Sequence, residues 1–236
     1  VAAAATAASQ DVDPSVGVPA VGNQPAAIGT GSSAPVSAAS STATLIYTNI
    51  PGLPQANVPG LAGTVFKPGT GTTNLDRVFG SPNGNWILTG LADLPTTEDE
   101  VVLVNGGLVQ QEGQSAPWTA GVENCGTVDQ RCGVNDAGDF TFATNTDGPT
   151  TADDYIVTNV GGVWGFSAME GQAVGPLPGN TYDDSLDSPV ILADGTSGFA
   201  ADGVDGTVVA GEDDLLILGS TLLVQAGVTT PPGQVA

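Results

Sequence analysis

The chain has 236 residues and a mass of 23.2 kDa, and its hydrophobic content of 40% is enough for a core although only 5% of the residues are aromatic. It carries 25 acidic residues, three basic residues and no histidine, which gives a net charge of −22. This charge repels nucleic acid and anionic lipid, so neither is expected as a partner. Without histidine a Ser–His–Asp or Cys–His mechanism is excluded, and two thiols are too few for a typical zinc site. We therefore expect a protein that is not an enzyme.

The N-terminal segment, residues 1–43, has a different composition from the rest of the chain. Small residues dominate it, and its only charges are Asp11 and Asp13. Such a segment cannot bury enough surface to offset its conformational entropy, so we expect a sheet edge to hold it, in its own chain or in a neighbouring subunit. Its Ser/Thr-rich part is also a candidate for O-linked glycan.

Residues 44–74 are predicted to contain leading strands and a proline-rich connector. One strand is expected at 63–67, and another at 44–48, which is the candidate assembly strand. The assembly strand consists of Thr44, Leu45, Ile46, Tyr47 and Thr48. Three prolines between the two strands favour an extended connection over a helix.

From residue 75 onward the sequence repeats. Residues 98–117, 153–176 and 212–231 share an acidic run, a short apolar strand, a turn of small residues, a second apolar strand, and a glycine followed by a proline. A repeat of this length is typical of stacked or radial units. In each unit an Asn/Asp–Gly turn and a strand precede this phrase, so a unit is expected to hold four antiparallel strands. The predicted domain therefore covers residues 75–236, with units at about 75–120, 121–180 and 181–236.

The middle unit carries a resemblance to a known family. Residues 135–142 (NDAGDFTF), then Gly161-Gly162-Val163 and the turn from Gly171 to Pro176, resemble the N-D-A-G-x-x-x-F, G-G-x-L and G-D-x-A-P elements of bacterial secreted propeller-like repeat proteins. Residues 112–117 (EGQSAP) are the best match to the last element. The resemblance covers about two thirds of the chain and implies propeller-blade-like repeats and a surface location, with no catalytic residue to carry over.

The number of units suggests how the protein assembles. Propellers have four to eight blades, so three units plus a partial leading unit are too few to close a ring. An open stack leaves strand edges that invite another chain. If the N-terminal segment of each subunit binds the next subunit, the contacts run head to tail and do not form a closed ring. Such contacts build a fibre. We expect an all-β fold of about three four-stranded propeller-blade-like repeats with an extended N-terminal segment, joined to copies of itself.

The two cysteines, Cys125 and Cys132, enclose a polar stretch of six residues. This spacing favours a small structural disulfide formed outside the cytosol, with two reduced loop thiols as the alternative. The oxidising compartment would imply that a signal peptide has been removed. The sequence has no stretch of 18 apolar residues, so no membrane span is expected.

Two further groups are candidate binding residues. Asp194, Asp202 and Asp205 alternate with glycines, which places hard oxygen ligands for calcium on a chain free to wrap an ion. A polar turn between strands is the alternative. Trp118 follows Pro117 in a predicted loop and is the tryptophan we expect to be exposed, where it would stack against a sugar.

Three functional hypotheses follow. We favour an extracellular structural protein that self-assembles, as a filament or surface-layer subunit, by donating a strand from the N-terminal segment. The alternative is a calcium- or polysaccharide-binding module of the cell surface. The third is a glycosidase run by carboxylates alone, which requires two buried carboxylates in one cleft.

Overall fold

The computed structural model describes residues 45–50, 52–69, 74–209 and 211–229. Contacts divide the chain into Val1–Ala43 and Thr44–Ala236, and every described residue belongs to the second part. The described residues form an all-β fold in which the only helical elements are two 3₁₀ turns, η1 (Pro54–Ala56) and η2 (Pro117–Thr119). They contain no helix with the length and apolarity that crossing a bilayer requires.

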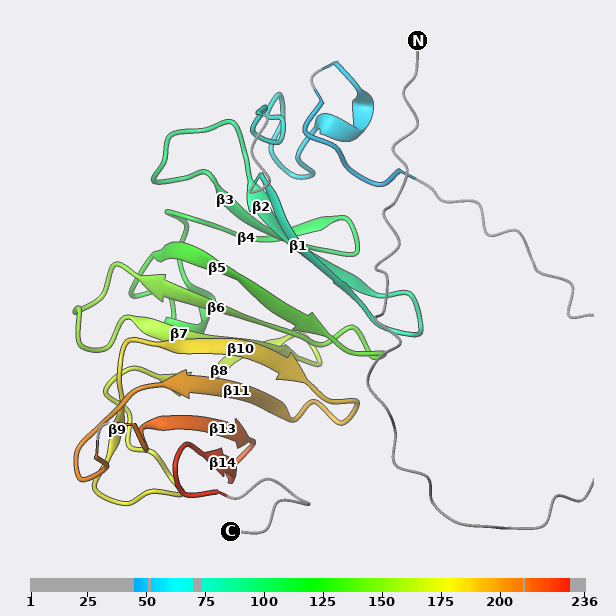
Figure 1. Ribbon diagram of the computed structural model, residues 1–236. Helices are drawn as coiled ribbons and strands as arrows, with labels where there is room; N and C mark the ends of the chain where they lie inside the picture. Colours follow the sequence, from blue (N-terminus) through cyan, green and yellow to red (C-terminus); the bar gives the residue numbers. More distant parts are fainter. Residues whose placement is uncertain (1–44, 51, 70–73, 210, 230–236) are drawn as a thin grey trace, which may run out of the picture. The chain divides into compact units, whose positions relative to one another are not determined.

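The strands form three four-stranded antiparallel sheets in chain order, and one two-stranded sheet, in the described part of the chain (Figure 1). The first sheet has the order β1 (Leu75–Gly80), β2 (Trp86–Leu91), β3 (Glu100–Val104), β4 (Gly107–Gln111). The second has the order β5 (Cys125–Val134), β6 (Phe140–Thr146), β7 (Asp154–Val160), β8 (Val163–Met169). The third has the order β10 (Leu186–Ile191), β11 (Ser197–Asp202), β13 (Asp214–Leu218), β14 (Thr221–Gln225). Strands β9 (Thr181–Tyr182) and β12 (Val204–Asp205) pair with each other. The all-β prediction is confirmed, with sheets inside the three predicted units.

Equivalent turns explain why the three sheets have the same order. The turns β1–β2, β5–β6 and β10–β11 each place a glycine in the left-handed region, Gly84, Gly138 and Gly195, with φ of 86°, 87° and 84°. The same two backbone hydrogen bonds close each turn, for example from the Gly138 N–H to the Asn135 carbonyl and from the Asn135 N–H to the Asp139 carbonyl. Left-handed backbone is strained for residues with a Cβ, so the Asn/Asp–Gly pattern fixes where each first strand reverses.

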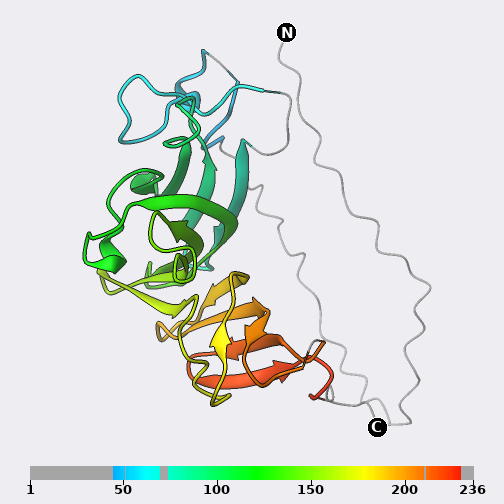
Figure 2. The same ribbon diagram turned by 90° about the vertical axis from the view of Figure 1, so that its left-hand side faces the viewer.

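Side-chain alternation gives each sheet two apolar faces. In the first sheet Leu88 and Leu103 lie in a cluster with residues 58–66, whereas Ile87 and Val102 lie in a cluster with the second sheet. In the second sheet Ile156 faces the third sheet instead. Since successive residues of a strand point to opposite faces, each pair of neighbouring sheets encloses one core. The three sheets follow one another in chain order in Figures 1 and 2.

The leading region does not form the strands that the sequence predicts. Residues 45–48 are not in a strand, and residue 44 lies outside the described residues. In the predicted strand 63–67 there are only two isolated bridges, Asn57↔Val65 and Phe66↔Ala92. Tyr47 instead packs on Phe66 and Trp86, with ring centroids 5.3 and 5.7 Å apart. Burying these rings on the first sheet outweighs local strand propensity, and the prolines interrupt any continuous ladder.

Candidate functional site

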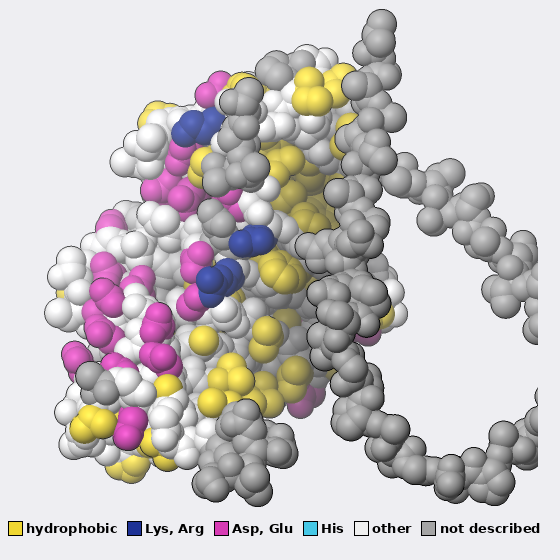
Figure 3. Space-filling view, viewed as in Figure 1, with side chains coloured by type: hydrophobic (Ala, Val, Ile, Leu, Met, Phe, Trp, Pro, Cys, Tyr) yellow, Lys and Arg dark blue, Asp and Glu magenta, His cyan; other side chains and the backbone are white. Residues whose placement is uncertain are grey.

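Two of the three acidic runs of the sequence contribute to one cavity. A hollow of about 550 Å³ is lined by residues of all three large sheets and their connections. Its carboxylates are Asp76, Glu100, Asp129, Asp154, Asp184, Asp187 and Asp202. Acidic side chains gather on the left-hand side of the molecule in Figure 3. Because each acidic run directly precedes the third strand of its sheet, its last residue begins that strand, as Glu100 begins β3 and Asp154 begins β7.

Partial burial raises the pKa of three of these carboxylates, Glu100, Asp154 and Asp76. Loss of hydration raises the pKa of Glu100 from 4.5 to about 7, and the neighbouring Glu112, Asp99 and Asp76 add to the rise. A hydrogen bond donated by the Val128 N–H to Glu100 opposes the effect in part.

The same effect acts on two other carboxylates of the cavity. The pKa of Asp154 rises to about 7, mainly by loss of hydration and then by repulsion from acidic neighbours that include Asp153 and Glu170. The pKa of Asp76 rises to about 6 by loss of hydration, although the nearby charge of Arg77 opposes the rise. The cavity therefore brings negative charges close together, and their mutual repulsion opposes folding at neutral pH.

The basic residues neutralise little of this charge. Lys67 Nζ lies 2.8 Å from Asp99 Oδ2, and Arg131 pairs with Asp187 of the next sheet. Among the described residues no three His, Cys, Asp or Glu side chains lie close enough together to hold a metal ion. The cavity is thus an acidic hollow without a converging set of metal ligands.

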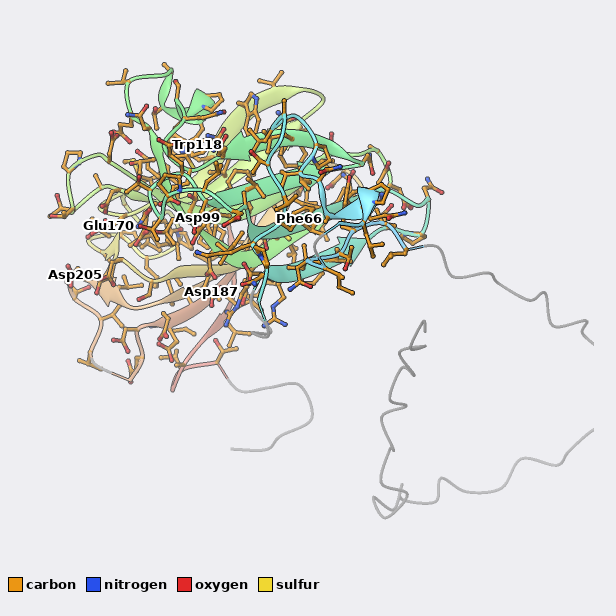
Figure 4. All side chains as sticks on the ribbon, turned by 90° about the horizontal axis from the view of Figure 1, so that it is seen from above. Phe66, Asp99, Trp118, Glu170, Asp187 and Asp205 are labelled. Carbon is orange, nitrogen blue, oxygen red and sulfur yellow. The ribbon has the colours of Figure 1, made fainter. Side chains whose placement is uncertain are left out.

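The predicted calcium ligands do not come together. Asp194 lies in the turn before β11, whereas Asp202 ends that strand and Asp205 ends β12. The six residues of β11 span roughly 17–20 Å, which separates Asp194 from the other two. Asp194 Oδ1 accepts a hydrogen bond of 2.9 Å from the Thr196 N–H, and so serves its own turn. Asp205 lies at the margin of the body in Figure 4. The three aspartates are part of separate turns and strand ends, as in the polar-turn alternative.

The predicted disulfide between Cys125 and Cys132 is not formed. Both cysteines are unbonded and buried, and both lie on strand β5. Their partners on β6 are Thr146 and Phe142, four residues apart along one strand. That corresponds to roughly 13 Å, well beyond the ~7 Å between Cα atoms that a disulfide tolerates. The prediction was wrong because the stretch expected to be a loop is an extended strand.

Trp118 is not the exposed tryptophan that the sequence predicts. Its exposed fraction is 6%, and its ring lies 5.7 Å from Phe142 and 5.9 Å from Trp164. The residue is in η2, which folds back over the second sheet as Pro117 begins the turn. Trp118 is therefore a core residue, and no sugar can stack on its face. Figure 4 labels its position.

Contacts between equivalent turns link the sheets, and sequence analysis did not identify them. Asn85 Nδ2 of the first turn donates to the carbonyls of Asn135 and Asp136 in the second, at 3.3 and 3.1 Å. Asn135 Nδ2 in turn donates to the Leu192 carbonyl of the third, at 2.8 Å. The recurrence of Asn at these turns was a signal for these links, but the partners depend on how the sheets pack.

The face of each sheet that is turned to the next sheet is here called its forward face. On the first two sheets the middle of this face is buried: Val102 and Ile156, at equivalent positions of β3 and β7, have exposed fractions of 0%. The residue at the same position of β13 is Leu216, and its exposed fraction is 41%. The third sheet therefore has an apolar forward face that no described strand covers.

When the chain was compared with models of protein families, with curated proteins and with solved structures, nothing matched it.

Proposed function

We propose that the chain is an extracellular structural protein that self-assembles, as a subunit of a filament or surface layer, by docking its N-terminal segment on an adjacent copy. The three sheets act in this proposal as propeller-blade-like repeats that do not close into a ring. The observation that carries the proposal is the open forward face of the third sheet, where Leu216 is exposed although its counterparts are fully buried. Large apolar patches on a protein surface mark contact sites.

The charge distribution favours the N-terminal segment as the contacting element. The segment contains only Asp11 and Asp13, so 23 of the 25 acidic residues and all three basic residues lie after it. Two bodies with a net charge near −20 repel each other, whereas the segment approaches a second body with little repulsion. The support for an extracellular location is the resemblance of the middle unit to secreted repeat proteins. The cysteines add no support, because they are unbonded and therefore do not indicate an oxidising compartment.

Removal of residues 1–43 tests this function. We expect the full chain to form polymers in negative-stain electron microscopy and light scattering, and the truncated chain to be a folded monomer. As a control, a Gly/Ser linker of equal length in place of the segment should also give monomers, with an unchanged melting temperature. Normal assembly of the truncated chain, or a full chain that stays monomeric at high concentration, would contradict the proposal.

The acidic cavity favours a second candidate, the carboxylate-run glycosidase. It holds Glu100 and Asp154, whose pKa values near 7 suit a general acid, beside other carboxylates. None of the described residues that line the cavity is aromatic, so the cavity lacks a platform for a sugar ring. Release of reducing sugar from acidic and neutral polysaccharides by the wild type, and its loss in Glu100→Gln, would favour this candidate over assembly.

The residues on which the calcium- or polysaccharide-binding alternative was based do not form a binding site in the structure. Its three aspartates are separated and its tryptophan is buried. A melting temperature that falls with a chelator and recovers with calcium would restore it.

A further inference from the structure

We propose that the forward face of the third sheet is the acceptor surface, and that it takes the N-terminal segment, residues 1–43, of a second copy of this chain. The inference rests on the proposed function and adds to it the place where the segment binds.

The forward faces of the first two sheets show what kind of element this fold places there. Strand β5 lies against β1, β2 and β3 of the first sheet, and its residues Val128 and Cys132 share a cluster with Ile87 and Val102. Strand β10 lies in the same way against β5, β6 and β7, with Leu186 in a cluster with Ile156. In both interfaces an extended segment lies across the forward face of the preceding sheet. By analogy, the forward face of the third sheet would also bind an extended segment.

The open face has two cross-strand rows of apolar residues. In one row Ala200 pairs with Leu216, which pairs with Val224. In the other Val190 pairs with Gly198, which pairs with Leu218. These residues alternate with Phe199, Leu215 and Ile217, which point into the core shared with the second sheet. Both rows therefore lie on the outer side.

Small residues make this face concave. A cavity of about 400 Å³ is lined by Ala200, Leu216, Val224 and Ala226, with Arg131, Asp187, Asp202 and Asp214 among its polar neighbours. A Cβ on Gly198 would lie 3.2 Å from Val190 Cγ2 and 3.1 Å from Leu218 Cδ1, so these two side chains already fill the space above the glycine. A hollow lined by small side chains such as Ala200 and Ala226 accepts alanine and valine better than large aromatic side chains.

The N-terminal segment matches this surface in size and charge. It begins with VAAAATAA and contains APVSAAS at 34–40, runs of small and β-branched residues. An extended run of eight residues is roughly 26 Å long, which is longer than the six-residue β11 that it would cross. The segment also carries only two of the acidic residues, so the aspartates around the face repel it far less than they repel another acidic body.

A pair of complementary variants tests the acceptor face. Leu216→Asp keeps the N-terminal segment but places a charge on the face, and the truncated chain lacking residues 1–43 keeps the face but has no segment. We expect each variant alone to be monomeric, and an equimolar mixture to form a 1:1 heterodimer with the summed mass of the two chains in analytical ultracentrifugation. Val163→Asp is the matched control, because Val163 has an exposed fraction of 72% and lies on the second sheet. This control should assemble as the wild type does.

The outcomes separate the two proposals. If Leu216→Asp still assembles while the truncated chain does not, the acceptor face is wrong and the proposed function stands. If the truncated chain also assembles, both fail. If the wild type is monomeric and Leu216→Asp strongly lowers its melting temperature, a segment of the same molecule covers the face and the intermolecular contact is refuted. Should Leu216→Asp not fold, Val224→Glu, at a position with an exposed fraction of 42%, repeats the test.

Discussion

Replacement of Glu100 by glutamine tests whether the acidic cavity weakens the fold at neutral pH. Glu100 has a pKa raised from 4.5 to about 7 because it is partly buried among other carboxylates. The folded state therefore binds the proton more tightly than the unfolded chain does. Its contribution to stability falls as the pH rises from about 4.5 to about 7, and is constant above that. Glutamine removes the charge and keeps an oxygen that can accept from the Val128 N–H.

The expected gain follows from the size of the pKa rise. At about 1.4 kcal/mol per pH unit, the full rise corresponds to roughly 3 kcal/mol, and solvent access to the cavity reduces this to about 1–2 kcal/mol. For a domain of this size, that gain raises the melting temperature by about 3–6 °C at pH 8. Most of it should be lost at pH 5, where the wild-type carboxyl is already protonated in the folded state.

Thermal unfolding followed by circular dichroism at pH 5 and pH 8 measures the effect. Glu98→Gln is the matched control, because Glu98 is an exposed carboxylate two residues earlier in the same acidic run. The control should change the melting temperature by less than the test variant at pH 8. A melting temperature that falls in Glu100→Gln, or that rises equally at both pH values, would refute the reasoning.

Three other predictions concern the repeat geometry and the core. Gly171→Ala should destabilise the fold by more than about 1–2 kcal/mol in urea unfolding, because φ is +72° and the new Cβ would lie 2.7 Å from a backbone oxygen. Gly161→Asn, also at positive φ but in open space, should be tolerated. Trp118→Ala should cost about 3–5 kcal/mol, since the ring is buried among other aromatic rings. Because Cys125 and Cys132 are unbonded and buried, dithiothreitol should not change the melting temperature, and both thiols should react with Ellman's reagent only after unfolding.

Much of the strand order was predictable because it depends on local chemistry. The Asn/Asp–Gly turns and the alternation of apolar residues lie within a few residues of the strands they define, and the structure has Gly138 and its two counterparts at the predicted reversals. The acidic runs likewise precede β3, β7 and β13 as their sequence positions suggest. Such features need no knowledge of distant contacts.

The errors concern residues whose surroundings depend on packing. Cys125 and Cys132 were assigned to a loop because their spacing does not reveal that the chain between them is an extended strand. Trp118 follows a proline that suggested exposure, but η2 turns its ring onto the second sheet. The segment around Tyr47 has strand propensity and forms none, because its aromatic ring buries more surface against Phe66 and Trp86.

The sequence by itself determined the all-β class, the threefold repetition and the strongly acidic character, since turn chemistry, side-chain alternation and charge are properties of the chain alone. Only the tertiary structure decided that carboxylates from three sheets meet at one cavity, and that Leu216 is exposed where Val102 and Ile156 are buried. Equivalent residues in a repeat have the same local conformation, but their burial depends on whether another element follows and covers them.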